Sequence, residues 1–253
     1  MQKFSGNNSS IKEEFESYLL FGGMPFLANF QGEQSDIMQY LRDIYNSVIL
    51  KDVVRRNDIR DVDLLERTSS YALANIGHVF SARSISNYLK SENRKAAPKT
   101  VLNYIRDLRE AYLLFRLNRE DVRGKNLLSV NEKYYVVDQG LREAVYEENF
   151  RDMDQLLENV VYMELLQRGY KVTVGKNGEK EIDFIARKDN SKIYVQVSYL
   201  LASQKTIERA FGAYKGIEDN FPKYVVSMDD FDMSRNGIKH RNIRDLLLAD
   251  EWD

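Results

Sequence analysis

The chain has 253 residues, 30% of them charged, with a formal net charge of -2 and a pI near 5.9. This balance excludes a polycation that binds nucleic acid through its overall charge. The sequence has no cysteine, which excludes disulfides and thiolate metal sites, and its two histidines argue against a zinc site or a Ser-His-Asp triad. No apolar run approaches the roughly 20 residues of a membrane-spanning helix, and the start of the chain lacks the apolar core of a signal peptide. We therefore expect a cytoplasmic protein without a membrane partner.

Residues 1–70 have the pattern of a helical linker or lid-like region. The first helix is predicted to end at Gly22-Gly23, because a glycine pair with a proline just beyond it stops a helix. Apolar residues at helical spacing predict a second helix, with Ser35 as its N-cap. A third helix follows and is expected to stop near Gly77.

Residues 71–132 have the element order of a winged helix-turn-helix domain. A short helix and a polar turn precede Pro98, which suits the first position of the next helix. Two strand-like segments follow, 112–118 and 126–138, and a polar stretch that contains glycine joins them as a hairpin or wing. Three helices followed by a hairpin are typical of winged helices.

The segment from Ser81 to Lys125 is basic, although the chain as a whole is acidic. It holds 11 Lys or Arg against 5 Asp or Glu, a local charge of +6. A recognition helix presents its N-terminal side chains to the major groove, while flanking cations contact phosphates. The residues expected to contact DNA are Lys99, Thr100, Asn103 and Arg106 on the helix, with Arg123 and Lys125 on the wing. The alternatives are a protein-interaction surface and a charged helix face that meets only solvent.

Residues 133–253 alternate between helical and strand patterns. The order is helix, three strands, helix, strand and closing helix, which predicts a mixed sheet flanked by helices and an α+β fold. Residues 169–177, GYKVTVGKN, resemble a nucleotide-binding loop, but five residues separate the glycines instead of four, and Asn177 replaces the magnesium-binding hydroxyl. The stretch also crosses a predicted strand, so we expect no nucleotide site in this chain.

The stretch EIDFIARKDNSKIYVQVSYL, residues 181–200, has the pattern of the centre of a metal-dependent nuclease. Asp183 lies in the first strand, and alternation places Gln196 and Ser198 on one face of the second. Glu158, on the preceding helix, is positioned to complete an acidic cluster. Oxygen atoms of Glu158, Asp183 and Gln196 would suit Mg²⁺, which is the cofactor that this pattern suggests.

Such chemistry also needs a cation to help activate water and to offset the charge on the phosphate. Ser198 stands where a nuclease of this type carries its lysine, and Lys205 on the next helix is the nearest substitute. The predicted catalytic set is therefore Glu158, Asp183, Gln196 and Lys205. We favour the alternative that this is a degenerate nuclease fold kept for its shape.

Several segments, in order along the chain, together resemble a known family. They are YLLFGGMP, YLRDIYNSVILKDVVRRN, FSARSISNYL with TVLNYIRDLREAYLLF, KYYVVDQGLR, and LENVVYMELLQRGYKV with EIDFIA and YVQVSY. This series resembles the C-terminal region of prokaryotic AAA-type ATPases, in which a nucleotide-binding module precedes a domain of unknown function. The resemblance implies a last domain similar to the restriction-endonuclease-like, PD-(D/E)xK fold. Glu158, Asp183 and Gln196 fall on its acidic positions, and Ser198 departs from its lysine.

The resemblance also implies a partner, because the sequence contains no ATPase module. We expect that the chain binds DNA or another partner for such an ATPase module. The chain could do so as an oligomer. Two other functions stay open from the sequence. One is an active Mg²⁺-dependent nuclease, and the other is a pure protein-interaction or oligomerisation module.

Overall fold

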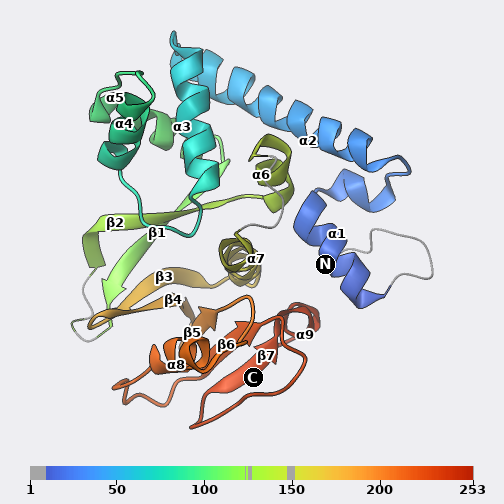
Figure 1. Ribbon diagram of the computed structural model, residues 1–253, viewed down its shortest axis with the longest axis vertical. Coiled ribbons are helices and arrows are strands. Elements are labelled where there is room, and N and C mark those ends of the chain that lie inside the picture. Colours follow the sequence, from blue (N-terminus) through green and yellow to red (C-terminus); the bar gives the residue numbers. More distant parts are fainter. Residues whose placement is uncertain (1–9, 123, 125–126, 147–151, 253) are drawn as a thin grey trace. The chain divides into compact units, whose positions relative to one another are not determined.

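The computed structural model describes residues 10–122, 124, 127–146 and 152–252 (Figure 1). The chain forms two compact units: unit 1 comprises residues 1–116 and 131–151, and unit 2 comprises 117–130 and 152–253. Helices and a seven-stranded mixed sheet make up the structure, which confirms the α+β prediction. None of the described helices combines the length and apolar character that crossing a bilayer requires. The three-part division predicted from the sequence stays a prediction.

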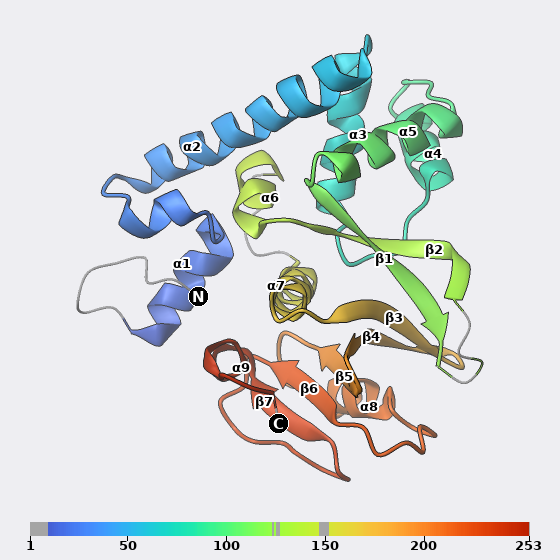
Figure 2. The same cartoon turned by 180° about the vertical axis from the view of Figure 1, so that it is seen from behind.

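Unit 1 consists mainly of helices (Figure 2), and their buried apolar residues belong to one core. Its helical elements are α1 (Ile11–Phe21), the 3-10 helix η1 (Pro25–Asn29), α2 (Gln34–Ser47), the π-helix η2 (Val48–Arg55), α3 (Val62–Ala74), α4 (Ala82–Ser91), α5 (Pro98–Glu110) and α6 (Gln139–Tyr146). Leu41, Leu65 and Leu73 are fully buried at its centre. Each such leucine contributes roughly 1.5–3 kcal/mol through removal of its surface from water.

The helix boundaries of unit 1 confirm most of the sequence predictions and correct one. Helix α1 stops at its C-cap Gly22, and Pro98 opens α5, as expected. The prediction of Ser35 as the N-cap of α2 is wrong, since the cap is Glu33. The backbone N–H of Glu33 donates to the Asp36 carboxylate at 3.2 Å, so an acid at the third helical position moves the start of the helix upstream.

The end of α1 is joined to the start of α6 by the buried carboxylate of Asp138. This carboxylate accepts backbone N–H bonds from Gly23 at 2.7 Å, from Gly140 at 2.8 Å and from Leu141 at 3.3 Å. Burial raises the pKa of Asp138, while the three amide donors act in the opposite direction. The side-chain amide of Gln139 adds a further bond, donating to the Tyr18 carbonyl at 2.8 Å.

Two glycines allow this close approach. Gly22 has a φ of +76°, and a Cβ built on it would lie 1.9 Å from the Asp138 carboxylate. A Cβ on Gly140 would lie 2.1 Å from the Phe21 carbonyl oxygen. The YLLFGGMP and KYYVVDQGLR segments, 115 residues apart where they meet, therefore approach each other backbone to backbone.

Helix α6 was not predicted from the sequence, and its length and composition explain why. The helix has only eight residues, and its buried residues from Gln139 to Ala144 include polar and charged ones, so its sequence does not resemble that of a core helix. Arg142 forms an ion pair with Glu143 and donates from Nε to the Leu73 carbonyl at 3.0 Å. These bonds tie α6 to α3 and satisfy the buried guanidinium.

Replacement of Asp138 by alanine should destabilise unit 1 by about 3 kcal/mol or more, because each buried amide left without an acceptor costs about 1–3 kcal/mol. Urea unfolding followed by circular dichroism measures this change. Asp52→Ala, which removes an exposed aspartate of the same unit, is the matched control and should change stability by less than about 0.5 kcal/mol. Equal stability of the two variants would contradict the role given to Asp138.

Unit 2 contains most of the sheet. Strands β1 (Leu114–Asp121) and β2 (Leu127–Val136) begin or end in unit 1; the elements that follow are α7 (Met153–Gln167), β3 (Lys171–Asn177), β4 (Lys180–Lys188), β5 (Ser191–Val197), α8 (Gln204–Gly212), β6 (Lys223–Ser227), β7 (Lys239–Asn242) and α9 (Ile243–Leu248). The strand order is β2-β1-β3-β4-β5-β6-β7. Strands β3, β4 and β5 are antiparallel neighbours, whereas β1 runs parallel to β3, and β5, β6 and β7 run parallel to one another.

Helices α7 and α8 cover opposite faces of this sheet. Tyr162 of α7 stacks on Phe184 of β4, with ring centroids 6.0 Å apart. Tyr194 of β5 alternates with Val195, the partner of Phe184, and therefore points to the other face. There it meets Tyr214, which follows α8. Strand β7 was not predicted, since its sequence Lys-His-Arg-Asn has little strand propensity and becomes a strand by pairing with β6.

Candidate nuclease-like site and nucleic-acid interface

Asp183 lies in a bulge of β4. Thr173 pairs with Ile185 and Gly175 pairs with Ile182, so β4 has one more residue than β3 between these two pairs. The bulge turns both isoleucines into the core under α8 and shifts the direction of the residues between them. Bulges of this kind are frequent next to active sites, where they re-aim a side chain.

The structure brings Asp183 and Gln196 together. The regular β4–β5 ladder ends at the pair Phe184–Val195, and beyond it side chains continue the connection. The Asp183 carboxylate accepts from the Val197 backbone N–H at 2.8 Å, and the Gln196 amide oxygen accepts from the Asp183 backbone N–H at 3.4 Å. Asp183 is only 4% exposed. Both candidate ligands are therefore already used to hold the strand ends.

Glu158 lies on the side of α7 that faces the end of β5. Asp154, one turn earlier on the same helix face, accepts from the Tyr199 backbone N–H at 2.6 Å. Glu158 itself is partly buried. Among the described residues, no three acidic or histidine side chains lie close enough together to hold a metal ion. A magnesium site would therefore depend on the Gln196 amide as a ligand.

Of the two positions considered for the nuclease lysine, 198 holds a buried serine, and the role of Lys205 stays a prediction. Ser198 is 1% exposed, and its backbone N–H donates to the Val226 carbonyl at 2.9 Å, so its position is closed. Lys205 is exposed on the first turn of α8 and makes no hydrogen bond or ion pair with any described residue. The arrangement can position oxygen atoms but does not show the charge that phosphoryl chemistry needs.

The chain should therefore not cleave DNA in the presence of Mg²⁺ or Mn²⁺. Removal of one electrostatic partner of the developing charge typically costs about 10²–10³ in rate. Gel assays with single- and double-stranded DNA test this, beside Asp183→Ala and Lys205→Ala. Cleavage that disappears in Asp183→Ala would show an active site, and cleavage that also disappears in Lys205→Ala would show that this lysine serves it.

Ser227, His240 and Asp229 lie in contact, but their hydrogen bonds run opposite to those of a catalytic triad. The Met233 backbone N–H donates to His240 Nδ1 at 3.2 Å, so Nε2 carries the proton and donates to Ser227 Oγ at 2.9 Å. Ser227 in turn donates to Asp229 at 2.7 Å. A triad histidine accepts the serine proton, which this one cannot do. Ser227 is also fully buried, so the network is structural.

This network makes stability depend on pH. Burial lowers the pKa of His240, so the folded chain keeps the ring neutral while the unfolded chain takes up a proton below about pH 6.5. The stabilising contribution is present above that pH and is lost as the pH falls through the folded pKa. Urea unfolding from pH 8 to pH 5, followed by the fluorescence of Trp252, should show this loss. His240→Gln should flatten the profile, because it removes the buried titratable ring.

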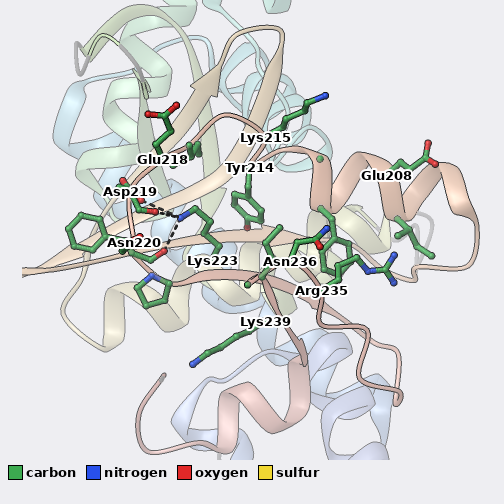
Figure 3. Close-up of a pocket in the computed structure, with 18 of the residues that line it drawn as sticks. Glu208, Tyr214, Lys215, Glu218, Asp219, Asn220, Lys223, Arg235, Asn236 and Lys239 are labelled. Carbon is green, nitrogen blue, oxygen red and sulfur yellow. Dashed lines mark hydrogen bonds and ion pairs between the residues drawn. The ribbon is translucent and has the colours of Figure 1, made fainter.

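A hollow of about 890 Å³ lies in unit 2 beside α8 (Figure 3). Its charged rim is mixed, with Lys215 and Lys239 against Glu208 and Glu218. Arg235 covers the ring of Phe211 at 4.7 Å. None of the predicted catalytic residues lines this hollow. Because its charges are mixed, it indicates no single class of ligand.

In unit 1, α4 packs against α5. Three exposed lysines of this region, Lys90, Lys95 and Lys99, are called the lysine row. Lys99 is exposed on the first turn of α5, and Thr100 and Asn103 are partly exposed on the same helix. Lys90 and Lys95 line a hollow of about 370 Å³ at the turn that leads into α5. These two lysines were not among the predicted DNA contacts, although both lie in the segment of net charge +6.

The other predicted DNA contacts differ in their placement. Arg106 is exposed on α5 but pairs with Asp107 at 3.0 Å and with Glu110 at 3.8 Å, so part of its charge is neutralised. Arg123 and Lys125 lie outside the described residues. The described part of the surface therefore depends on the lysines.

The profile of a family described as a domain of unknown function, DUF8612, matches residues 12–152. Since this is more than half of the sequence, the chain belongs to that family. An uncharacterized protein of Haemophilus influenzae is 32% identical over 239 residues, which cover 94% of this chain and 58% of that protein. An uncharacterized protein of Methanocaldococcus jannaschii is 28% identical over 216 residues, 83% of this chain and 47% of that protein. The chain thus spans about half the length of these relatives, and the resemblance to AAA-type ATPases stays a prediction.

Proposed function

We propose that residues 71–132 form a winged-helix module that binds duplex DNA, and that the module does so for a longer protein with an AAA-type ATPase module. The observation that carries this proposal is the lysine row at the turn between α4 and α5. Lys90, Lys95 and Lys99 are exposed and form no ion pair with any described residue. Cations without intramolecular partners are available to phosphates, and binding releases the counterions that phosphates hold.

The local topology supports the winged-helix interpretation. Helices α3, α4 and α5 follow one another and lead into β1 and β2. A bridge between Val79 and Lys133 adds a short third strand position beside β2, between α3 and α4 in sequence. This is the order in which winged helices place a recognition helix before the wing, and α5 holds the recognition position.

We propose that the nuclease-like part of unit 2 has a structural role and no catalytic activity. Asp183 and Gln196 hold backbone groups, and Ser198 occupies a closed position. The bulge at Asp183 and the α7–sheet–α8 arrangement are compatible with descent from a nuclease fold. Function is argued from the site and not from the fold, so the alternative of an active nuclease depends on the cleavage assay described above.

The change of Lys90, Lys95 and Lys99 to alanine should weaken binding to a labelled 20-base-pair duplex. The slope of log K against log salt should fall by about 0.9 for each phosphate that the variant no longer neutralises. Fluorescence anisotropy between 50 and 200 mM NaCl measures both quantities.

The matched control is Lys51→Ala, Arg55→Ala and Arg56→Ala together, which removes three exposed cations elsewhere in unit 1. It should keep most of the affinity and the slope. An equal decrease of DNA affinity in both triple variants would mean that binding depends on the net charge of the chain and not on the lysine row. No binding by the unchanged chain at 50 mM NaCl would favour the protein-interaction module.

A further inference from the structure

An acidic, tyrosine-lined hollow of about 710 Å³ lies in unit 1 between α3, α4 and the end of α6. Asp63, Glu66 and Glu92 contribute carboxylates to its lining, and Arg67 contributes its only cation among the described residues. The lining residues therefore carry a formal charge of -2, part of which Arg94 offsets from outside the lining through its ion pair with Asp63. This is opposite in sign to the lysine row, although α4 contributes to both surfaces.

The carboxylates of this hollow already bind two guanidinium groups, that of Arg67 and that of Arg94, whose Nη2 lies 3.1 Å from Asp63. Arg67 Nε lies 3.2 Å from Asp63, and its Nη1 lies 3.4 Å from Glu92. The Arg67 side chain remains 46% exposed, so the pair does not close the hollow. Glu66 is exposed and has no hydrogen-bond or ion-pair partner among the described residues. One carboxylate is thus left for a cation from outside.

Aromatic rings form the second part of the lining. Tyr71 and Tyr88 pack with ring centroids 4.9 Å apart and ring planes at 50°. Tyr146 also lines the hollow, but Arg142 already lies over its ring, 5.0 Å from the centroid. Tyr88 is 42% exposed, and its hydroxyl donates to Glu92 at 2.8 Å, which fixes the ring. Tyrosine faces attract organic cations, more so when a carboxylate is near. The tyrosine rings in its lining distinguish this hollow from an acidic surface that contacts only solvent.

We propose that this hollow binds a lysine or arginine side chain from a basic segment of a partner protein. A metal ion is a poorer match, because Arg67 engages two of the carboxylates and the rings offer no hard ligand. Nucleic acid is excluded by the negative charge. The hollow is much larger than one ammonium or guanidinium group, so residues that flank the cation in an extended segment can contact its walls. This surface is separate from the DNA surface and does not depend on it.

The probes are an arginine-glycine peptide of nine residues, acetyl-arginine amide and tetramethylammonium, each titrated into the full chain. Amide chemical shifts in ¹⁵N-labelled protein locate and measure the binding. We expect the peptide to bind at least tenfold more tightly than acetyl-arginine amide and to shift signals around Glu66 and Tyr88. Equal affinity of the peptide and the free cations would overturn the assignment to a protein segment. No shift at these residues with any probe would overturn the site.

Two pairs of variants test the two parts of the lining. Glu66→Lys should abolish peptide binding, whereas Glu16→Lys, the same charge change at an exposed position of α1, should leave it within about twofold. Tyr88→Leu should weaken binding about fivefold, whereas Tyr88→Phe keeps the ring and should retain the affinity. Thermal unfolding verifies that each variant is folded. Unchanged binding in Glu66→Lys, or an equal decrease in both Tyr88 variants, contradicts the proposal.

Discussion

The architecture of unit 1 depends on one buried carboxylate that connects segments far apart in the sequence. Asp138 accepts from backbone amides of both segments, so it completes the end of α1 and the start of α6 at once. Helix N-termini and chain reversals leave amides without partners, and a carboxylate is the acceptor best suited to several of them. Gly22 and Gly140 leave the room for this close approach, and Arg142 extends it to α3. A polar contact thus joins α1 to α6, and Arg142 joins α6 to α3, beside the apolar core of unit 1.

Helix α4 divides two surfaces of opposite charge. Its Lys90 belongs to the lysine row, whereas its Tyr88 and Glu92 belong to the tyrosine-lined hollow. The division follows from helix geometry, because residues two positions apart point about 160° away from each other when the helix turns once per 3.6 residues. A single short helix can thus serve a polyanion on one side and a cation on the other. Unit 1 could in this way join a nucleic acid to a basic protein segment without competition between them.

The elements that the sequence predicted correctly are those with strong local signals. Pro98 and the glycine pair at Gly22 mark helix ends through backbone restrictions that no distant residue changes. Helix α6 and strand β7 were missed because their structure comes from tertiary packing and pairing. For the candidate site, the sequence placed Asp183 and Gln196 on neighbouring strands, but it could not show the bulge at Asp183 or that each side chain bonds to backbone. The ion pairs of Arg106 could not be foreseen from helical spacing alone.

The β1–β2 hairpin belongs to both units, so the boundary between the units does not fall at one point in the sequence. Residues 117–130 are counted in unit 2, although the chain on either side of them belongs to unit 1. Within unit 2, β1 runs parallel to β3, and Glu120 accepts from Arg187 and from Thr173. The family profile ends at residue 152, after this hairpin. A fragment that starts there would lack a strand of its own sheet, so unit 2 is not encoded by one contiguous stretch of the sequence.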